Sequence, residues 1–309
     1  PGNRMLITAD SHDAFHPWPE GRGDWVEAVW FGTWVPERAM TIYVYHTFRP
    51  ALGIYGGGCI IWDSQSNLPW DAPLYQFDVC RPIPGRIDLR NLQLDNGARI
   101  TSLLEGHEFE VEFRNARAHL CLKFTATTPP DLTERDGTPE FFAGHLDQPG
   151  KYEGFVEIEG QRHVIDAFGI RDRSWGPRKI GDDIRMGYAH GAAPDVAFLA
   201  FSRPAGAREE IFKGYLSLDG ERVPVASGHR EIEREGLKLK RIRFALTDKS
   251  GRTLEGNGTP LNQFSYMSYP NMLSHHYLMR WELPAGIVYG EEQDLWSLPL
   301  WRDHIRETQ

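Results

Sequence analysis

Residues 108–113 read Glu-Phe-Glu-Val-Glu-Phe, so acidic and apolar side chains alternate along this stretch with a period of two. In an extended chain Phe109, Val111 and Phe113 point to one face and the three glutamates point to the other. One buried face and one wet face are typical of a strand in an antiparallel sheet. The stretch therefore predicts a β-strand.

Similar strand-like runs extend from it in both directions. In the first half they cover residues 25–34, 40–46, 57–63, 74–79 and 119–124. In the second half they cover residues 152–159, 162–168, 184–190, 196–201, 210–218, 237–246, 263–269, 275–281 and 287–291. Turn signals separate the runs, and Asn96-Gly97 is the strongest hairpin signal among them. About sixteen short strands in two consecutive blocks favour two antiparallel barrels or sandwiches.

Helical signals are weak by comparison. No window of about 12 residues has a convincing 3.6-residue period. The best short-helix candidate is residues 293–306, which we expect Pro299 to split. Residues 127–139 are polar, proline-rich and aperiodic, so we expect them to connect two halves. We place these halves at residues 1–148 and 149–309.

The composition agrees with a globular β protein. The 309 residues include 31 Gly, 21 Pro, 10 Trp, 11 Tyr and 16 Phe. A net charge of −9 argues against a nucleic-acid-binding protein, because binding phosphates needs a clustered basic surface. The longest apolar run, residues 196–201, is far shorter than the ~20 residues of a membrane-spanning helix.

The chain ends and the cofactor motifs give further expectations. No retained signal peptide is recognisable, so the cytoplasm is the expected location. Residue 1 is Pro, so the removal of an upstream segment stays open, as does the oligomeric state. Neither a dinucleotide fingerprint, a P-loop, an HExxH motif nor a G-x-S-x-G elbow occurs. We therefore expect no cofactor.

The three cysteines, Cys59, Cys80 and Cys121, form no CxxC pair, which excludes a zinc ribbon. Their apolar neighbours predict that each is a small buried side chain. His275 and His276 are adjacent in a predicted strand and point to opposite faces. They cannot ligate one metal ion together, so we expect no metal site.

The densest group of charged and aromatic side chains is Asp-Ala-Phe-Gly-Ile-Arg-Asp-Arg-Ser-Trp-Gly-Pro-Arg at residues 166–178, where we expect a strand to end near Gly169. Arg171 and Arg173 favour an ionised Asp172, whereas apolar neighbours favour its protonated form, and the sequence leaves this open. In a purely structural interpretation, the tryptophan of this stretch plugs a barrel end. The aspartate then pairs with an arginine or caps a turn.

Residues 169–178 resemble the G-x-x-D-[HR]-x-W-G signature of the AttH/hydroxyneurosporene-synthase (CrtC-like) family, and residues 280–291 resemble its closing strand. The resemblance implies an all-β chain of two tandem lipocalin-like barrels or half-barrels with little helix. Members of the family hydrate double bonds of carotenoids or prenyl groups, or guide cyclisations of terpenoid and polyketide skeletons. The chain has Arg173-Ser174 where several relatives have His-Asn or His-Glu, which leaves its own reaction open.

The resemblance also implies roles for two residues. Asp172 corresponds to an aspartate implicated in catalysis in the hydratase branch, so it is expected to donate a proton or to orient water. Trp175 is expected to form a pocket wall or to stabilise a developing carbocation through its π face.

Other candidates follow from the strand pattern. Tyr188 and His190 share one face of a strand, where they supply a hydroxyl and an acid–base group or pack in the core. Either His275 or His276 points toward a pocket if the strand borders one. Asp166 is either a second carboxylate near Asp172 or a solvated charge on the outer face.

Aromatic residues of the first half are candidates for substrate binding. These are Trp30, Tyr43 and Tyr45. The alternative for Trp30, as for Trp34 and Trp62, is a place in the core.

The residues and the resemblance together predict an enzyme without a cofactor that acts on a hydrophobic, isoprenoid-derived or polycyclic small molecule. The expected reaction is acid–base hydration or dehydration of a double bond, or a related cyclisation or isomerisation. One alternative is a non-catalytic carrier of an apolar metabolite, because a fold does not fix a function. Another is an interaction module whose barrels are filled by side chains. An enzyme needs a carboxylate, histidine or tyrosine in its cavity, whereas a carrier does not.

Overall fold

The computed structural model describes residues 12–85, 88–134 and 142–308. This part of the chain contains twenty strands, one α-helix and two short 3-10 helices, η1 (Pro36–Arg38) and η2 (Pro50–Leu52). The predicted all-β class with two tandem domains is confirmed. Five of the strands were not predicted from the sequence: β5 (Asn91–Gln93), β6 (Ala98–Leu104), β9 (Asp131–Glu134), β15 (Glu221–Glu235) and β17 (Thr253–Pro260).

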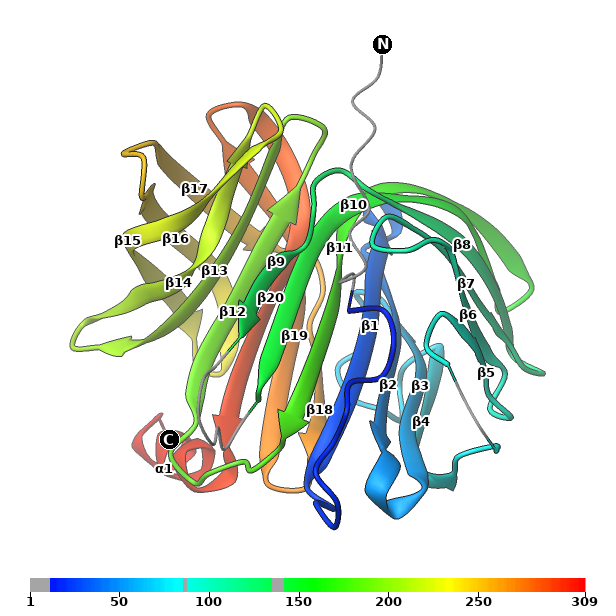
Figure 1. Cartoon of the computed structure of the whole chain (residues 1–309). Coiled ribbons are helices and arrows are strands. Elements are labelled where there is room, and N and C mark those ends of the chain that lie inside the picture. Colours follow the sequence, from blue (N-terminus) through cyan, green and yellow to red (C-terminus); the bar gives the residue numbers. More distant parts are fainter. Residues whose placement is uncertain (1–11, 86–87, 135–141, 309) are drawn as a thin grey trace. The chain divides into compact units, whose positions relative to one another are not determined.

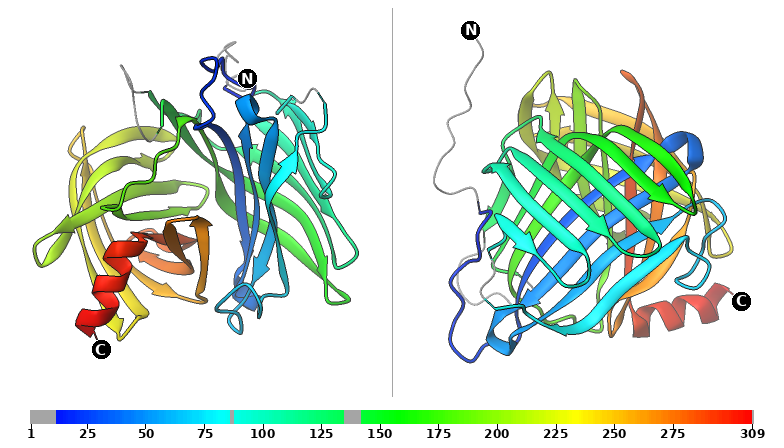
Figure 2. Two further views of the ribbon diagram at one scale, coloured as in Figure 1. Left: turned by 90° about the horizontal axis from the view of Figure 1, so that it is seen from below. Right: turned by 90° about the vertical axis from the view of Figure 1, so that its right-hand side faces the viewer.

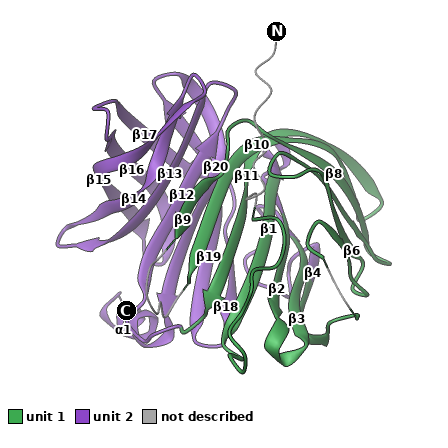
Figure 3. Ribbon diagram, in the orientation of Figure 1, with its two compact units in different colours: residues 1–33, 43–60, 76–179 green, residues 34–42, 61–75, 180–309 purple. Residues whose placement is uncertain are grey.

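The chain forms two compact units (Figure 3). The first consists of residues 1–33, 43–60 and 76–179, and the second of residues 34–42, 61–75 and 180–309. The division of the sequence at residues 148/149 falls inside β10 (Gly144–Ile158), and it stays a prediction.

The first unit is built on an eleven-stranded half-barrel sheet with the order β4-β3-β2-β1-β11-β10-β8-β7-β6-β5, and β9 pairs with β10 (Figure 1). Its remaining strands are β1 (Trp25–Val35), β2 (Met40–Arg49), β3 (Ile54–Trp62), β4 (Leu74–Pro82), β7 (Glu108–Arg114), β8 (Ala118–Ala126) and β11 (Gln161–Pro177). The hairpin expected at Asn96-Gly97 joins β5 to β6, and Gly97 has a φ of 97°, which favours glycine.

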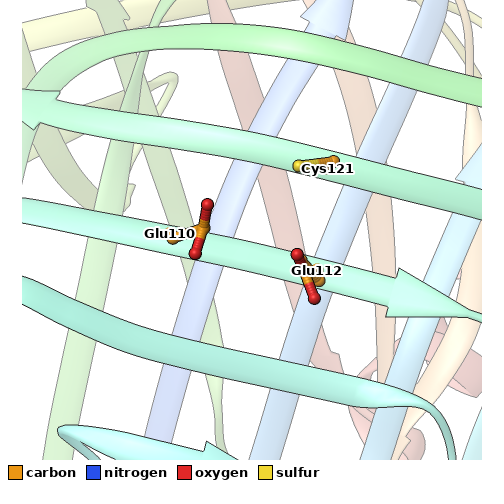
Figure 4. Close-up of side chains that lie close together, drawn as sticks. All are labelled: Glu110, Glu112 and Cys121. Atoms are coloured by element: carbon orange, nitrogen blue, oxygen red, sulfur yellow. The ribbon is translucent and has the colours of Figure 1, made fainter.

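Strand β7 shows why the sheet forms. Phe109, Val111 and Phe113 are buried, as the alternation predicts. Their glutamate neighbours lie on the opposite face, where Glu110 and Glu112 lie close to Cys121 of β8 (Figure 4). The buried face thus faces an aromatic core, and the other face is accessible to water.

The second unit is built on a closed barrel of eight strands (Figure 2). The sheet has nine strands in the order β17-β16-β15-β14-β13-β12-β20-β19-β18. The further pairing of β17 with β19 closes eight of them into the barrel, and β18 pairs with β19 outside this circle. The strands not yet given are β12 (Arg185–Ala192), β13 (Val196–Ala205), β14 (Arg208–Leu218), β16 (Lys238–Asp248), β18 (Phe264–Tyr269), β19 (Met272–Leu283) and β20 (Gly286–Ser297). Phe198, Phe244 and Trp281 are among the apolar side chains of its core.

Two expectations about local structure are wrong. Helix α1 spans Leu298–Thr308, so Pro299 lies in its first turn instead of splitting it, while residues 293–297 continue β20. Proline is tolerated there because the first N–H groups of a helix lack partners within it. Residues 127–139 are not a plain connection, because they contain β9, and residues 135–141 lie outside the described chain.

The cysteines differ from one another. Cys59 is buried as predicted, Cys121 is half-buried and Cys80 is exposed. Cys80 lies near the end of β4, at the edge of the sheet, where no further strand covers it. Among the described residues, no helix is long and apolar enough to cross a membrane.

Candidate functional site

Asp172 lies in the middle of β11 and not after it, because this strand continues past Gly169 to Pro177. Its cross-strand neighbours are Asp147 on β10 and Trp30 on β1. The pleat directs Asp172 to the face opposite Arg171 and Arg173.

Two residues that were not predicted from the sequence, His145 and Asp147, lie beside Asp172. The Nε2 atom of His145 lies 2.7 Å from Oδ2 of Asp172, and its Nδ1 atom lies 3.1 Å from Oδ2 of Asp147. We call His145, Asp147 and Asp172 the aspartate–histidine cluster. The signal for it was the His-x-Asp spacing at residues 145–147, which places both side chains on one face of a strand.

Burial and charge act in opposite directions on the imidazole. The side chains of Asp147, His145 and Asp172 are 1%, 13% and 16% exposed. Burial by itself lowers the pKa of His145, but the negative charges and hydrogen bonds of the two carboxylates outweigh it and raise this pKa to about 9. At neutral pH the imidazole of His145 is therefore protonated.

This arrangement suits proton transfer. Asp147 is inaccessible and fixes the orientation of the His145 ring, as a buried carboxylate does for a histidine base. Asp172 is the partly exposed end, and it receives a hydrogen bond along which a proton can move. The chemistry that the cluster supports is acid–base catalysis at Asp172.

The same side chains are of metal-ligand type. The ligand atoms of His145, Asp147 and Asp172 lie within 4.8 Å of one another, as do those of Glu110, Glu112 and Cys121. In the first group a metal ion must displace the proton of the imidazolium, because a histidine ligand is neutral. The absence of a metal site therefore stays a prediction.

The structure does not bring Trp175 and Asp172 together. Trp175 is buried and points to the opposite face of β11, where it packs against Trp25 and Leu146. The arginines do not pair with Asp172 either. Arg171 forms an ion pair with Asp13 at 3.0 Å, Arg173 forms one with Glu27 at 3.0 Å, and Arg178 donates a hydrogen bond to Ser174.

Trp30 is the aromatic side chain beside Asp172. It points to the same face, since the two residues are cross-strand partners, and its ring meets Tyr43 edge-on at 5.1 Å. Gly32 makes room for the indole, because a Cβ atom there would lie 2.3 Å from it. Tyr45, also a candidate, stacks on Phe77 at 6.2 Å.

Asp166 is not the second carboxylate near Asp172. Its side chain is 70% exposed and lies 3.1 Å from Nζ of Lys151. The alternative interpretation, a solvated charge on the outer face, therefore describes it, and Asp147 of the neighbouring strand takes the place beside Asp172.

The second unit brings three of the other candidates together. His190 of β12 and His276 of β19 lie beside Glu291 of β20, a residue not predicted from the sequence, and Tyr188 of β12 contacts the His190 ring. Oε1 of Glu291 lies 2.8 Å from Nδ1 of His276, and Oε2 lies 3.6 Å from Nε2 of His190. Gln293 also donates to Oε2, at 3.2 Å.

We call His190, His276 and Glu291 the glutamate–histidine cluster. Burial raises the pKa of Glu291 well above its usual range, and burial together with His275 lowers the pKa of His276 to about 3. The hydrogen-bonded pair of Glu291 and His276 is therefore neutral, with the proton on the carboxyl group.

Aromatic rings surround this cluster within the second unit. The rings of Trp62 and Tyr266 lie 6.1 Å and 5.1 Å from that of His276, and Trp34 lies 5.9 Å from His190. Tyr188 meets the His190 ring edge-on at 5.6 Å. The surroundings are apolar, which explains the strong effect of burial on the pKa values.

His275 points to the other face of β19. Its Nδ1 lies 2.6 Å from Oγ of Ser265, and its ring lies 4.5 Å from that of Trp301 in α1. Of the two adjacent histidines, only His276 takes part in the cluster.

A pocket of about 600 Å³ opens on the second unit, lined by parts of β15, β16, β17 and β19. Its lining includes Glu231, Arg243 and Phe244 but no residue of either cluster. None of the site residues predicted from the sequence lines it, so the two clusters are the stronger candidates.

The comparisons with known proteins concern family and fold. A family model described as a domain of unknown function, DUF7064, matches residues 9–283. No curated protein matches the chain by sequence.

Three solved structures are similar over most of the chain. A crystal structure described as an AttH candidate from Nitrosomonas europaea has 12% identity and a TM-score of 0.53, with 87% of this chain and 92% of that chain covered. CghA has 11% identity and a TM-score of 0.56, with 91% and 94% covered. Kievitone hydratase from Nectria haematococca has 10% identity and a TM-score of 0.48, with 94% and 93% covered. The expected likeness to the AttH-type proteins is confirmed for the fold alone.

Proposed function

The chain belongs to the family described as a domain of unknown function, DUF7064, and from its geometry we propose that it is a hydratase-like enzyme. Its substrate is a hydrophobic small molecule, isoprenoid-derived or polycyclic, and it uses no cofactor. The observation that carries the proposal is the 2.7 Å contact of His145 with a partly exposed Asp172, with the buried Asp147 behind the imidazole.

In hydration, Asp172 delivers a proton to one carbon of the double bond, and the π electrons form the new C–H bond. The other carbon becomes a carbocation, which the π face of Trp30 stabilises. Water forms a C–O bond with this carbon and releases a proton to the carboxylate of Asp172. Dehydration is the reverse sequence, so no oxidant or reductant is required.

His145 and Asp147 have supporting roles in this scheme. His145 holds a proton that it passes to Asp172 through the 2.7 Å contact. Asp147 holds the imidazole in the orientation that presents Nε2 to Asp172. Trp30 and Tyr43 supply an apolar wall beside the reacting carboxyl group.

The experiment measures exchange of a tertiary alcohol with water. A panel of terpenoid tertiary alcohols, with linalool as the first probe, is incubated with the full chain in H₂¹⁸O, and ¹⁸O incorporation is followed by mass spectrometry. Reversible dehydration exchanges the hydroxyl oxygen. We expect Asp172→Asn to lower the exchange rate at least about 100-fold, the usual contribution of a positioned acid–base group.

The matched control is Asp166→Asn, which removes an exposed carboxylate from the same strand. It should leave the rate unchanged. Full exchange by Asp172→Asn would remove Asp172 from the proposed chemistry. If no member of the panel exchanges with the unaltered chain but the chain binds them, a carrier becomes the better interpretation.

A further inference from the structure

Residues 12–16 lie on the inner face of the first unit, the face of β11 opposite Asp172. They belong to no helix or strand, and the side chains of Arg171 and Arg173 on β11 bind them. The guanidinium group of Arg173 donates one hydrogen bond to the carbonyl oxygen of His12 at 3.1 Å and another to that of Ala14 at 3.0 Å. This segment is thus attached to the sheet in the way a bound peptide is.

The segment places one carboxylate, that of Asp13, in a buried cationic site. Asp13 is 3% exposed, and its Oδ1 lies 3.0 Å from Nη1 of Arg171, while Oδ2 accepts the backbone N–H of Gly106. Arg171 is 1% exposed, donates to Gln148 at 2.6 Å and lies over the Phe109 ring at 4.2 Å.

This cationic site has an unused donor. Among the described residues, Nη2 of Arg171 has no hydrogen-bond partner. Asp13 engages only Nη1, although a guanidinium group can bind both oxygens of a carboxylate side by side. A carboxylate that approaches Arg171 in that geometry satisfies the buried donor that Asp13 leaves unused.

Both terminal residues of the segment, His12 and His16, place planar rings on an aromatic face. The His16 ring stacks on Trp175 with centroids 3.8 Å apart and planes 10° apart, and the His12 ring stacks on it at 4.9 Å. The backbone N–H of His16 donates to Glu27 at 3.0 Å. The face of Trp175 therefore accepts planar groups.

The two recognition elements lie on one strand face. Arg171 and Trp175 are four residues apart, which places their backbone positions roughly 13 Å from each other. We propose that residues 12–16 are an internal ligand, and that the site beneath them binds an elongated planar aromatic carboxylate that displaces them. Its carboxylate pairs with Arg171, and its ring stacks on Trp175. This site is separate from the proposed hydratase site, because it lies on the other face of β11.

The internal segment competes with any external ligand, because a tethered group has an effective concentration of about millimolar. The full chain should therefore bind such a ligand weakly, and weakening the segment should strengthen binding. The probes are 4-(1-pyrenyl)butyrate and its uncharged counterpart 4-(1-pyrenyl)butanol, each titrated by pyrene fluorescence.

We expect Asp13→Ala to bind pyrenebutyrate at least about tenfold more tightly than the unaltered chain, because a competitor of the ligand is removed. Adding Arg171→Met to Asp13→Ala should abolish the gain. Pyrenebutanol should show no gain in either variant. Equal affinity of the two chains for pyrenebutyrate, or an equal gain for the alcohol, would overturn the proposal.

Asp13→Ala leaves Arg171 as an unpaired buried charge, so the thermal midpoint is measured as well. Pyrenebutyrate should raise the midpoint of Asp13→Ala more than that of the unaltered chain, and an equal or absent rise contradicts the proposal. If Asp13→Ala does not fold, His16→Ala decides. It removes the nearer of the two rings stacked on Trp175, keeps the Asp13–Arg171 ion pair, and should bind pyrenebutyrate about threefold more tightly. Unchanged affinity in His16→Ala would overturn the proposal.

Discussion

The aspartate–histidine cluster of the first unit and the glutamate–histidine cluster of the second unit use the same residue types with opposite results. Two carboxylates around one imidazole outweigh the effect of burial and raise the pKa of His145 to about 9. One fully buried carboxyl group between two imidazoles has its own pKa raised, and the pKa of His276 falls to about 3. The ratio of carboxylates to imidazoles and the depth of burial decide which cluster is charged.

This difference separates two roles. The aspartate–histidine cluster holds an exchangeable proton on a partly exposed edge, which suits proton transfer. The Glu291–His276 pair of the glutamate–histidine cluster is buried and neutral, so its hydrogen bond stabilises the second unit without a buried net charge.

The largest expected effect is on the charged cluster. Asp147→Asn removes a charge that faces the buried imidazolium, so we expect the free energy of unfolding at pH 7 to fall by about 3–5 kcal/mol, the range for breaking a buried ion pair. Urea denaturation measures it. The exposed control Asp166→Asn should change the value by less than about 0.5 kcal/mol. A loss as small as that of the control would mean that the cluster is not charged.

The next effect concerns pH. The pKa of His145 is raised in the folded state to about 9, so its stabilisation is fully present below the unfolded value of ~6.5 and is lost as the pH rises through 9. We expect a loss of about 3 kcal/mol across this window, measured by urea denaturation at pH 6 to 9.5. In Asp147→Asn the slope should be much smaller. An equal slope in both chains would assign the pH dependence to another group.

A smaller effect is expected in the neutral cluster. Glu291→Gln replaces a neutral acid with a neutral amide of similar shape, so the free energy of unfolding at pH 7 should change by less than about 1 kcal/mol. Urea denaturation again measures it. A loss comparable to that of Asp147→Asn would show that Glu291 is ionised, and the contrast between the clusters would disappear.

The smallest expected effect is spectroscopic. A protonated carboxyl group has a carbonyl stretching band distinct from those of carboxylates, and this band should persist in the unaltered chain at pH 7. The pKa of Glu292 is raised by burial to about 7, so this residue contributes to the band as well, and the comparison is made by difference. The infrared spectrum of the unaltered chain minus that of Glu291→Gln should contain the band, whereas the spectrum of the unaltered chain minus that of Asp147→Asn should not. A first difference spectrum without the band would contradict our assignment of the proton.

Much of the fold could be predicted from local pattern. The alternation in β7, the hairpin at Asn96-Gly97 and the opposite faces of His275 and His276 all follow from the period of two. Strand β15 was missed because its burial does not follow a clear alternation. Helix α1 was misplaced because proline was read as a breaker and not as a residue of the first turn.

The candidate site could be predicted only in part. Tyr188 and His190 share a face, as their spacing indicates, and Asp172 is in the proposed site. Trp175 is not beside Asp172, because the strand continues through both residues and an odd spacing places them on opposite faces. The strand was predicted to end near Gly169, so the opposite faces of Asp172 and Trp175 could not be inferred from the sequence.

The sequence by itself determined most of the strands and the face that each side chain takes within them, because these follow from the geometry of an extended chain. Only the tertiary structure decided which residues meet across strands. The register of β10 against β11 brings His145 to Asp172, and the pairing of β20 with β12 and β19 brings Glu291 to two histidines. The protonation of each cluster depends on these contacts between strands, because a pKa is set by neighbouring charges and by burial, and neither is determined within a single strand.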